Sequence, residues 1–197
     1  FTTFPGGKGA NQAVAAARAG GASVQMLLAL GEDAFAVPLE ASLTGAGVLL
    51  HIVRCADLAT GTAFICVSDA AENAITVAPG ANNALEGRHL PAMGGFSHLL
   101  MQLETPLATV AAYARAARAA GSKVVLNAAP ARQLDAGLLD LLDILVVNQG
   151  ELASICGNSA SIAEGLQRLK VPVVVVTLGE RGCCARVGEH YLVQPAF

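Results

Sequence analysis

Residues 144–156, Ile-Leu-Val-Val-Asn-Gln-Gly-Glu-Leu-Ala-Ser-Ile-Cys, decide the fold class of this chain. An unbroken run of branched apolar residues leads directly into an asparagine and a helix-forming segment. Such a run is typical of a strand buried in a parallel sheet that is covered on both faces. The pattern predicts a strand over 144–147 followed by a helix over 149–156.

The same alternation continues on both sides of this stretch. Further strands are expected over 98–103, 123–126 and 171–177, and further helices over 107–120, 135–142 and 162–169. Strands that alternate with helices indicate an α/β fold, a doubly wound and mostly parallel sheet with helices on both faces. We expect residues 1–47 and 79–197 to form this core. The β-like segments of residues 48–78 are expected to form a small inserted sheet, or lid.

Composition narrows the classes of function. The chain has 197 residues, a formal net charge of -3 and no cluster of basic residues, so neither nucleic acid nor an anionic membrane is expected as a partner. No apolar run reaches the length of a membrane span. The five cysteines are scattered and lack metal-ligand spacing, which favours reduced thiols and a cytoplasmic protein.

The opening segment Pro5-Gly6-Gly7-Lys8-Gly9-Ala10-Asn11 precedes an alanine-rich, helix-forming run. Glycines at a helix start allow close approach of the backbone to a ligand, and the free N–H groups there suit an anion or a polar group. Lys8 adds a positive charge and Asn11 a side-chain amide. The segment is therefore a candidate binding site.

Polar groups also follow the predicted strands, where ligands bind in parallel α/β sheets. Glu104 is interpreted either as a ligand for sugar hydroxyls or as a cap of the helix that follows Pro106. Asn148 and Glu151 are interpreted either as a ligand pair, with Glu151 holding a water on Mg²⁺, or as a helix cap with a first-turn acid. Residues 177–182 form either a phosphate-binding turn or a simple hairpin.

Two nucleotide-binding motifs are absent. A Walker loop needs a glycine five residues before Gly7 and a hydroxyl residue after the lysine, but Thr2 and Gly9 stand there. The dinucleotide fingerprint lacks its third glycine. These absences argue against a nicotinamide-dependent dehydrogenase.

Several motifs occur in a fixed order along the chain. They are Pro5-Gly6-Gly7-Lys8-Gly9-Ala10-Asn11-Gln12-Ala13, Gly31-Glu32-Asp33-Ala34-Phe35, Thr60-Gly61-Thr62-Ala63, Gly80-Ala81-Asn82, Gln102-Leu103-Glu104, Leu126-Asn127-Ala128-Ala129-Pro130-Ala131 and Thr177-Leu178-Gly179. Together they resemble the PfkB family of carbohydrate kinases, and within it the ribokinases. The resemblance covers essentially the whole chain.

The resemblance implies an ATP-dependent kinase that phosphorylates D-ribose at its 5-hydroxyl. Its sugar-binding residues would be Gly7, Lys8, Gly9, Ala10, Asn11 and Glu104. Its ATP-binding residues would be Asn148, Thr177, Leu178, Gly179, Glu180, Arg181 and Gly182. Glu151 would orient Mg²⁺ through water, K⁺ is a further implied cofactor, and the lid would pair two subunits into a homodimer.

The sequence also departs from the family pattern. Val147 replaces a usual proline, and Gly150 replaces a common threonine. The family's first strand is expected upstream of Phe1, and its catalytic aspartate base is expected beyond Phe197. The resemblance therefore implies a fragment that is inactive by itself. Deoxyribokinase, nucleoside kinase and fructokinase activities stay open as alternatives, as does a sugar-binding protein without catalysis.

Overall fold

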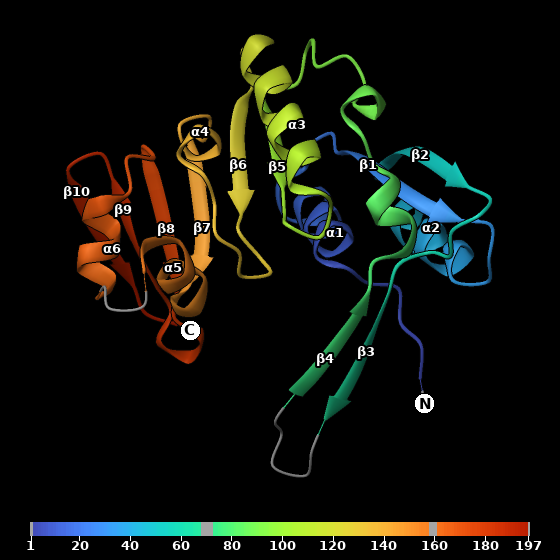
Figure 1. The fold of residues 1–197 in the computed structure, drawn as a ribbon, viewed down its shortest axis with the longest axis horizontal. Helices are drawn as coiled ribbons and strands as arrows, with labels where there is room; N and C mark the ends of the chain where they lie inside the picture. The colour runs from blue at the N-terminus through green and yellow to red at the C-terminus, as the bar shows by residue number, and fades with distance from the viewer. Residues whose placement is uncertain (1, 68–72, 158–160, 197) are drawn as a thin grey trace. The chain divides into compact units, whose positions relative to one another are not determined.

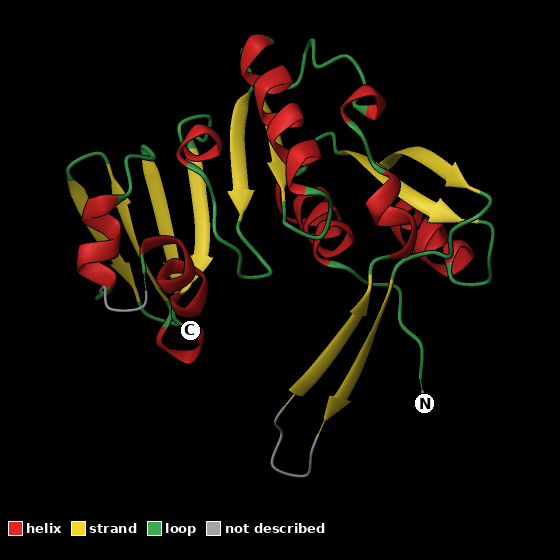
Figure 2. Ribbon diagram, in the orientation of Figure 1, coloured by secondary structure: helices red, strands yellow, loops and turns green. Residues whose placement is uncertain are grey.

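The computed structural model describes residues 2–67, 73–157 and 161–196 (Figure 1). It divides into two compact units. The first unit comprises residues 1–91 and 104–106, and the second comprises residues 92–103 and 107–197. Figure 2 shows helices and strands in both units, as an α/β fold requires.

The first unit is built on a parallel pair of strands. Strand β1 (Gln25–Gly31) pairs with β2 (Leu49–Cys55), and the connection between them contains helix α2 (Ala36–Gly45). Pro38 lies in the first turn of α2, where its missing N–H leaves no hydrogen bond unmade. Helix α1 (Lys8–Gly20) packs its buried Ala10 and Ala13 into the same apolar cluster as Leu28 and Leu30 of β1.

A hairpin and two short 3-10 helices complete the first unit. Strands β3 (Thr62–Val67) and β4 (Asn73–Ala78) are antiparallel and pair with each other, and η1 (Gly80–Ala84) and η2 (Gly87–His89) follow them. Of the three β-like segments expected within residues 48–78, the structure places the first beside β1 and the other two in this hairpin.

The second unit contains the larger sheet. Among the described residues it has six strands in the order β10-β9-β8-β7-β6-β5. Strands β5 (His98–Met101), β6 (Lys123–Asn127), β7 (Ile144–Asn148) and β8 (Val173–Thr177) are parallel, while β9 (Cys183–Val187) and β10 (His190–Gln194) are antiparallel. The expected α/β architecture with a mostly parallel sheet is confirmed.

Helices cover the sheet of the second unit. Helix α3 (Leu107–Ala119) packs on β5 and β6, and α5 (Gln149–Cys156) packs on β7 and β8, beside α6 (Ile162–Arg168). The short α4 (Ala136–Leu139) is capped by Asp135, whose side chain accepts a hydrogen bond from the N–H of Leu138. Alternate strand residues are fully enclosed, namely Val124, Leu126, Leu145, Val147, Val174 and Val176.

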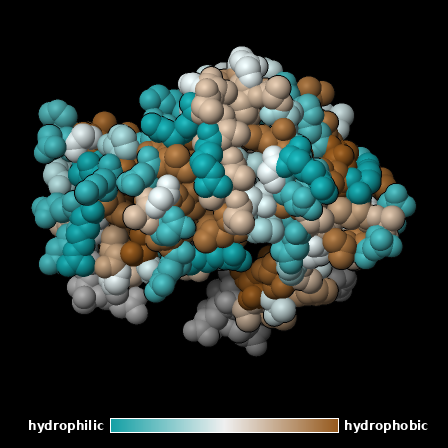
Figure 3. Space-filling model, turned by 45° about the horizontal axis from the view of Figure 1, so that its top comes forward, coloured by the Kyte–Doolittle hydropathy of each residue, from teal (hydrophilic) through white to brown (hydrophobic). Residues whose placement is uncertain are grey.

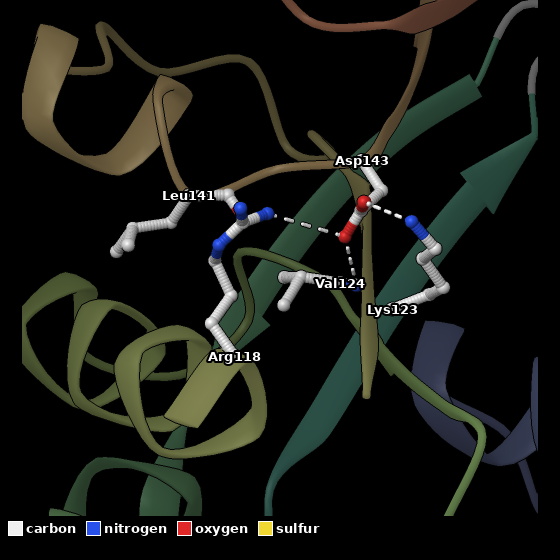
Figure 4. A network of polar contacts seen from close by, with 5 residues as sticks. All are labelled: Arg118, Lys123, Val124, Leu141 and Asp143. Atoms are coloured by element: carbon white, nitrogen blue, oxygen red, sulfur yellow. Dashed lines mark hydrogen bonds and ion pairs between the residues drawn. The ribbon is translucent and has the colours of Figure 1, made fainter. Parts of the chain in front are cut away.

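A polar network ties the amino-terminal ends of β6 and β7 together (Figure 4). Asp143 accepts hydrogen bonds from Nζ of Lys123 at 2.8 Å and from the N–H of Val124 at 2.9 Å, and Arg118 lies 3.4 Å away. Burial raises the pKa of Asp143, but these hydrogen bonds and the two cations outweigh burial and hold the pKa below its ordinary value.

Candidate active site

The start of helix α1 is shaped by Gly7. Gly7 is the N-cap residue, with φ of 98°, a conformation that favours glycine. It has no side chain to cap the helix, and the first turn of α1 carries no acidic residue. The first N–H groups of α1 are therefore open to an acceptor from a distant side chain, from water or from a ligand.

Glu104 supplies that acceptor. Its Oε2 lies 2.9 Å from the backbone nitrogen of Lys8, although 96 residues separate the two in sequence. A carboxylate at a helix amino terminus is stabilised by the N–H group and by the helix dipole. The structure thus joins two predicted sugar-binding residues, and Glu104 caps the start of helix α1.

The other residues of this segment differ in exposure. Ala10 is buried in the core of the first unit, which fixes the helix in place. Lys8 and Glu104 are half-buried, and Asn11 is exposed. This arrangement presents a charged and an amide side chain on a rigid helix start, which suits recognition of a ligand with several hydroxyl groups.

The start of helix α5 is a capping box. Oδ1 of Asn148 accepts a hydrogen bond from the N–H of Glu151 at 2.8 Å, and Oε2 of Glu151 accepts one from the N–H of Asn148 at 2.7 Å. Glu151 is 8% exposed while Asn148 is exposed. The structure confirms the interpretation of this pair as a helix cap. A role of the pair in ligand binding remains a prediction.

Mg²⁺ is the metal that the resemblance implies near Glu151. Oxygen ligands are the kind that Mg²⁺ prefers, and it commonly takes one or two carboxylates while keeping several waters. Within the described ranges, no group of three or more His, Cys, Asp or Glu side chains could hold a metal ion. Glu151 offers a single carboxylate, and its water-mediated contact with Mg²⁺ stays a prediction.

Residues 177–182 form a tight turn between β8 and β9. The backbone N–H of Leu178 donates to Gly182 O at 2.8 Å, and the N–H of Gly182 donates to Gly179 O at 2.9 Å. The sequence pattern of strand, glycine turn and return strand is confirmed by the antiparallel pairing of β8 and β9. Thr177, Glu180 and Arg181 are exposed at this turn.

A hydrogen bond that the sequence did not reveal connects this turn to helix α5. Nη2 of Arg181 lies 2.7 Å from Oε1 of Gln149, the first residue of α5. The register pairs Asn148 with Thr177 as the last residues of β7 and β8. All the predicted ATP-binding residues therefore lie together at one edge of the second unit. The feature of the sequence that indicated this common location is that these residues follow strands that are neighbours in the sheet.

Two shallow surface depressions lie away from these residues. One is lined by residues that include Glu32, Glu40 and Arg54, and the other by residues that include Arg132 and Ser154. The predicted sugar-binding and ATP-binding residues line neither of them. No described helix is both long and apolar enough to cross a membrane.

Comparison with known families identifies the chain. The model of the pfkB family carbohydrate kinase matches residues 1–197. The chain belongs to the PfkB family of carbohydrate kinases. This assignment confirms the family resemblance of its motifs.

Relatives within the PfkB family include named kinases. The chain is 39% identical to a ribokinase of Haemophilus influenzae over 96% of its length and 31% identical to a deoxyribokinase of Salmonella typhi over 98%. It spans 66% of the length of the Haemophilus protein and 67% of the Salmonella protein.

Solved structures of PfkB kinases share the fold of this chain. It resembles a ribokinase of Thermotoga maritima with a TM-score of 0.86 and 29% identity, over 100% of this chain and 67% of that one. It resembles an Arabidopsis thaliana ribokinase complexed with ribose and ATP with a TM-score of 0.84 and 28% identity, over 98% of this chain and 67% of that one. The fold is therefore ribokinase-like.

Proposed function

We propose that this chain provides the sugar- and nucleotide-binding residues of a kinase that phosphorylates D-ribose at its 5-hydroxyl with ATP. Membership of the PfkB family and the ribokinase relatives support this proposal. The structural observation that carries it is the hydrogen bond between Glu104 and the start of α1, which joins two separate motifs of the family into one polar site.

In the first unit, we assign sugar binding to residues 7–11 and Glu104. Lys8 and Asn11 donate hydrogen bonds to sugar hydroxyls, and Glu104 accepts hydrogen bonds from sugar hydroxyls. Glu104 holds the helix start and leaves the charged Lys8 side chain to the substrate. The first N–H of α1 is occupied by Glu104, so this site suits a neutral polyol better than a phosphate.

In the second unit, we assign ATP binding to Asn148 and residues 177–182. The exposed Asn148 amide and the turn place hydrogen-bonding groups beside the phosphate chain. Mg²⁺, which Glu151 would hold through water, supplies charge neutralisation on the phosphate oxygens. In the proposed reaction the sugar hydroxyl transfers its proton to a general base and forms a bond to the γ-phosphorus, and the bond from that phosphorus to ADP breaks, which leaves ADP as the second product.

Substrate choice is tested with the complete product of the gene that encodes this chain. ATP, Mg²⁺ and K⁺ are supplied with D-ribose, 2-deoxy-D-ribose, D-fructose or adenosine, and ADP release is measured. We expect the highest kcat/KM with D-ribose. A higher value with 2-deoxy-D-ribose would identify a deoxyribokinase, and phosphorylation of none of the four compounds would contradict the proposal.

We also propose that the β3–β4 hairpin acts as a lid that pairs two subunits. Both faces of the hairpin carry exposed apolar side chains, with Phe64, Ile65, Ile75 and Val77 each more than half exposed. Figure 3 shows hydrophobic surface over the hairpin. Cross-strand neighbours Ile65 and Ile75 lie on one face.

Sedimentation of the complete gene product tests this pairing. Ile65→Asp should shift a dimer to a monomer, because a buried unpaired charge opposes association. Val37→Asp provides the control, since Val37 is an exposed apolar residue on α2, outside the hairpin. Equal sedimentation of the wild type and Ile65→Asp would contradict the pairing.

A further inference from the structure

The β3–β4 hairpin is attached to the rest of the first unit at its base. Beyond the base, its described residues are exposed and have no extensive packing. Residues 63–66 and 74–78 are exposed along both strands. Strand β3 begins one residue after Gly61, and β4 ends one residue before Pro79. The orientation of the hairpin therefore depends on how residues 59–61 and 79–82 are fixed.

Thr60 is the centre of that base. It is 5% exposed, and its Oγ1 accepts a hydrogen bond from the N–H of Gly31, at the end of β1, at 3.0 Å. Its own N–H donates to Oδ2 of Asp33 at 2.6 Å, and its hydroxyl also donates to Asp33. The hydroxyl of Thr60 thus acts as both donor and acceptor, and together with the backbone N–H it ties the hairpin to β1 and to the turn that follows β1.

Asp33 connects this base to helix α2. Its Oδ1 accepts hydrogen bonds from the N–H groups of Phe35 and Ala36 at 3.0 and 3.2 Å, while its Oδ2 accepts the one from the N–H of Thr60. The hydrogen bond from the N–H of Thr60 is the main reason that the pKa of Asp33 is lowered. One carboxylate therefore holds the start of α2 and the base of β3 together.

Glycines allow the backbone to pack tightly at this base. A Cβ on Gly31 would meet the backbone at Leu58 and Thr60, and one on Gly80 would meet the carbonyl of Ala59. A Cβ on Gly61 would lie 2.7 Å from Pro79 O and from the amide nitrogen of Asn82. The N–H of Ala81 donates to Ala59 O at 2.8 Å, which ties the returning strand to the same point.

We infer that Asp33 and Thr60 are positioning residues that set the orientation of the β3–β4 hairpin and, through it, the affinity of the protein for its sugar. The second part rests on the proposed function. Neither residue is among the predicted sugar ligands, so both act through the hairpin. Loss of their hydrogen bonds frees the hairpin base while leaving β3 paired with β4.

The first test measures hairpin motion without reference to activity. A nitroxide is attached to the exposed Cys66 of β3 in the complete gene product, with every other cysteine replaced by alanine. The protein is diluted until light scattering shows a monomer. Asp33→Asn places an amide N–H against the N–H of Thr60, and Thr60→Val removes the hydroxyl with little change of shape. We expect both substitutions to narrow the lines of the electron paramagnetic resonance spectrum of the nitroxide, because the hairpin moves more freely. Glu32→Gln, which changes an exposed neighbouring carboxylate, and Thr60→Ser, which keeps the hydroxyl, should match the wild type.

The second test measures kinetics in the same variants without the label. We expect Asp33→Asn and Thr60→Val to raise the KM for the sugar at least tenfold. The KM for ATP and kcat should stay within about threefold of the wild type. Thr60→Ser should keep the wild-type KM for the sugar. An unchanged nitroxide spectrum in both variants would overturn the positioning role. A mobile hairpin with an unchanged sugar KM would overturn the link to the sugar. If no sugar is phosphorylated, the proposed function fails, and the spectra alone decide the positioning role.

Discussion

At the scale of single residues, the Glu104–Lys8 hydrogen bond has the clearest consequence. Gly7 cannot cap α1 with a side chain, so Glu104 does it from a distant loop. Glu104→Ala should lower the free energy of unfolding by about 1 kcal/mol, as for loss of a helix cap. Glu104→Gln keeps an acceptor oxygen and should lose less than half of that.

Urea denaturation of the complete gene product measures both values. The matched control is Glu180→Ala, which removes an exposed carboxylate in the second unit. If Glu104→Ala and Glu180→Ala are equally stable, Glu104 does not support α1.

Asp143 makes a residue-scale prediction about pH. Because its pKa is lowered in the folded protein, the unfolded protein binds more protons at acidic pH, and the stabilisation from Asp143 is lost as pH falls. Asp143→Asn should cost about 1–2 kcal/mol above pH 5, from weakened charge-assisted hydrogen bonds. The gap to the wild type should then shrink below about pH 4, near the ordinary pKa of an aspartate.

Denaturation at several pH values measures this gap, with Asp140→Asn as the control for an exposed carboxylate nearby. A gap that stays constant down to pH 2 would show that the hydrogen bonds of Asp143 do not depend on its charge.

At the scale of elements, the turn between β8 and β9 depends on Gly182. Gly182 has φ of 90°, and a Cβ there would meet the backbone of residues 194–196. Gly188 lies in the next turn with φ of 57°, but a Cβ there would meet nothing within 4 Å. Gly182→Ala should therefore destabilise the protein more than Gly188→Ala by about 2 kcal/mol.

Thermal unfolding of the two variants gives this difference. Both variants place a side chain at a positive φ, and the ψ of −130° at Gly182, outside the left-handed region that L residues tolerate, adds to its expected loss. Equal losses would mean that the close approach to residues 194–196 does not contribute to stability.

Helix α6 supplies a second element-scale prediction. Arg186 of β9 donates hydrogen bonds to the carbonyls of Leu166, Leu169 and Val171 at 2.6 to 2.8 Å, at the carboxyl end of α6. Arg186→Met should cost about 2–3 kcal/mol, because it removes hydrogen bonds from a charged donor to partly buried carbonyls. Arg168→Met is the control, since Arg168 makes one exposed hydrogen bond, to Cys156 O. Chemical denaturation that gives the same loss for both variants would contradict the role of Arg186.

The sequence predicted elements better than contacts. The expected helix over 149–156 matches α5, because its apolar strand, asparagine cap and glycine stop are all local signals. The expected strand over 98–103 ends at Met101 instead, since the N–H of Leu103 binds Ala129 O outside the strand pairing. The bonds from Glu104 to Lys8, Arg181 to Gln149 and Thr60 to Asp33 join residues 96, 32 and 27 positions apart, where no local pattern reports proximity.

At the scale of the whole molecule, sugar binding is proposed for the first unit and ATP binding for the second. Two variants separate these roles. Asn11→Ala removes the exposed amide on α1 and keeps a good helix former. Asn148→Asp keeps the helix cap but adds a negative charge where ATP phosphates are proposed to bind.

The most direct test is the pair of KM values, for D-ribose and for ATP, measured in both variants of the complete gene product. We predict that Asn11→Ala raises the KM for ribose at least tenfold and leaves that for ATP within twofold, and that Asn148→Asp does the reverse. If both variants raise the same KM, or if neither changes either value, the assignment of the two roles to the two units is wrong.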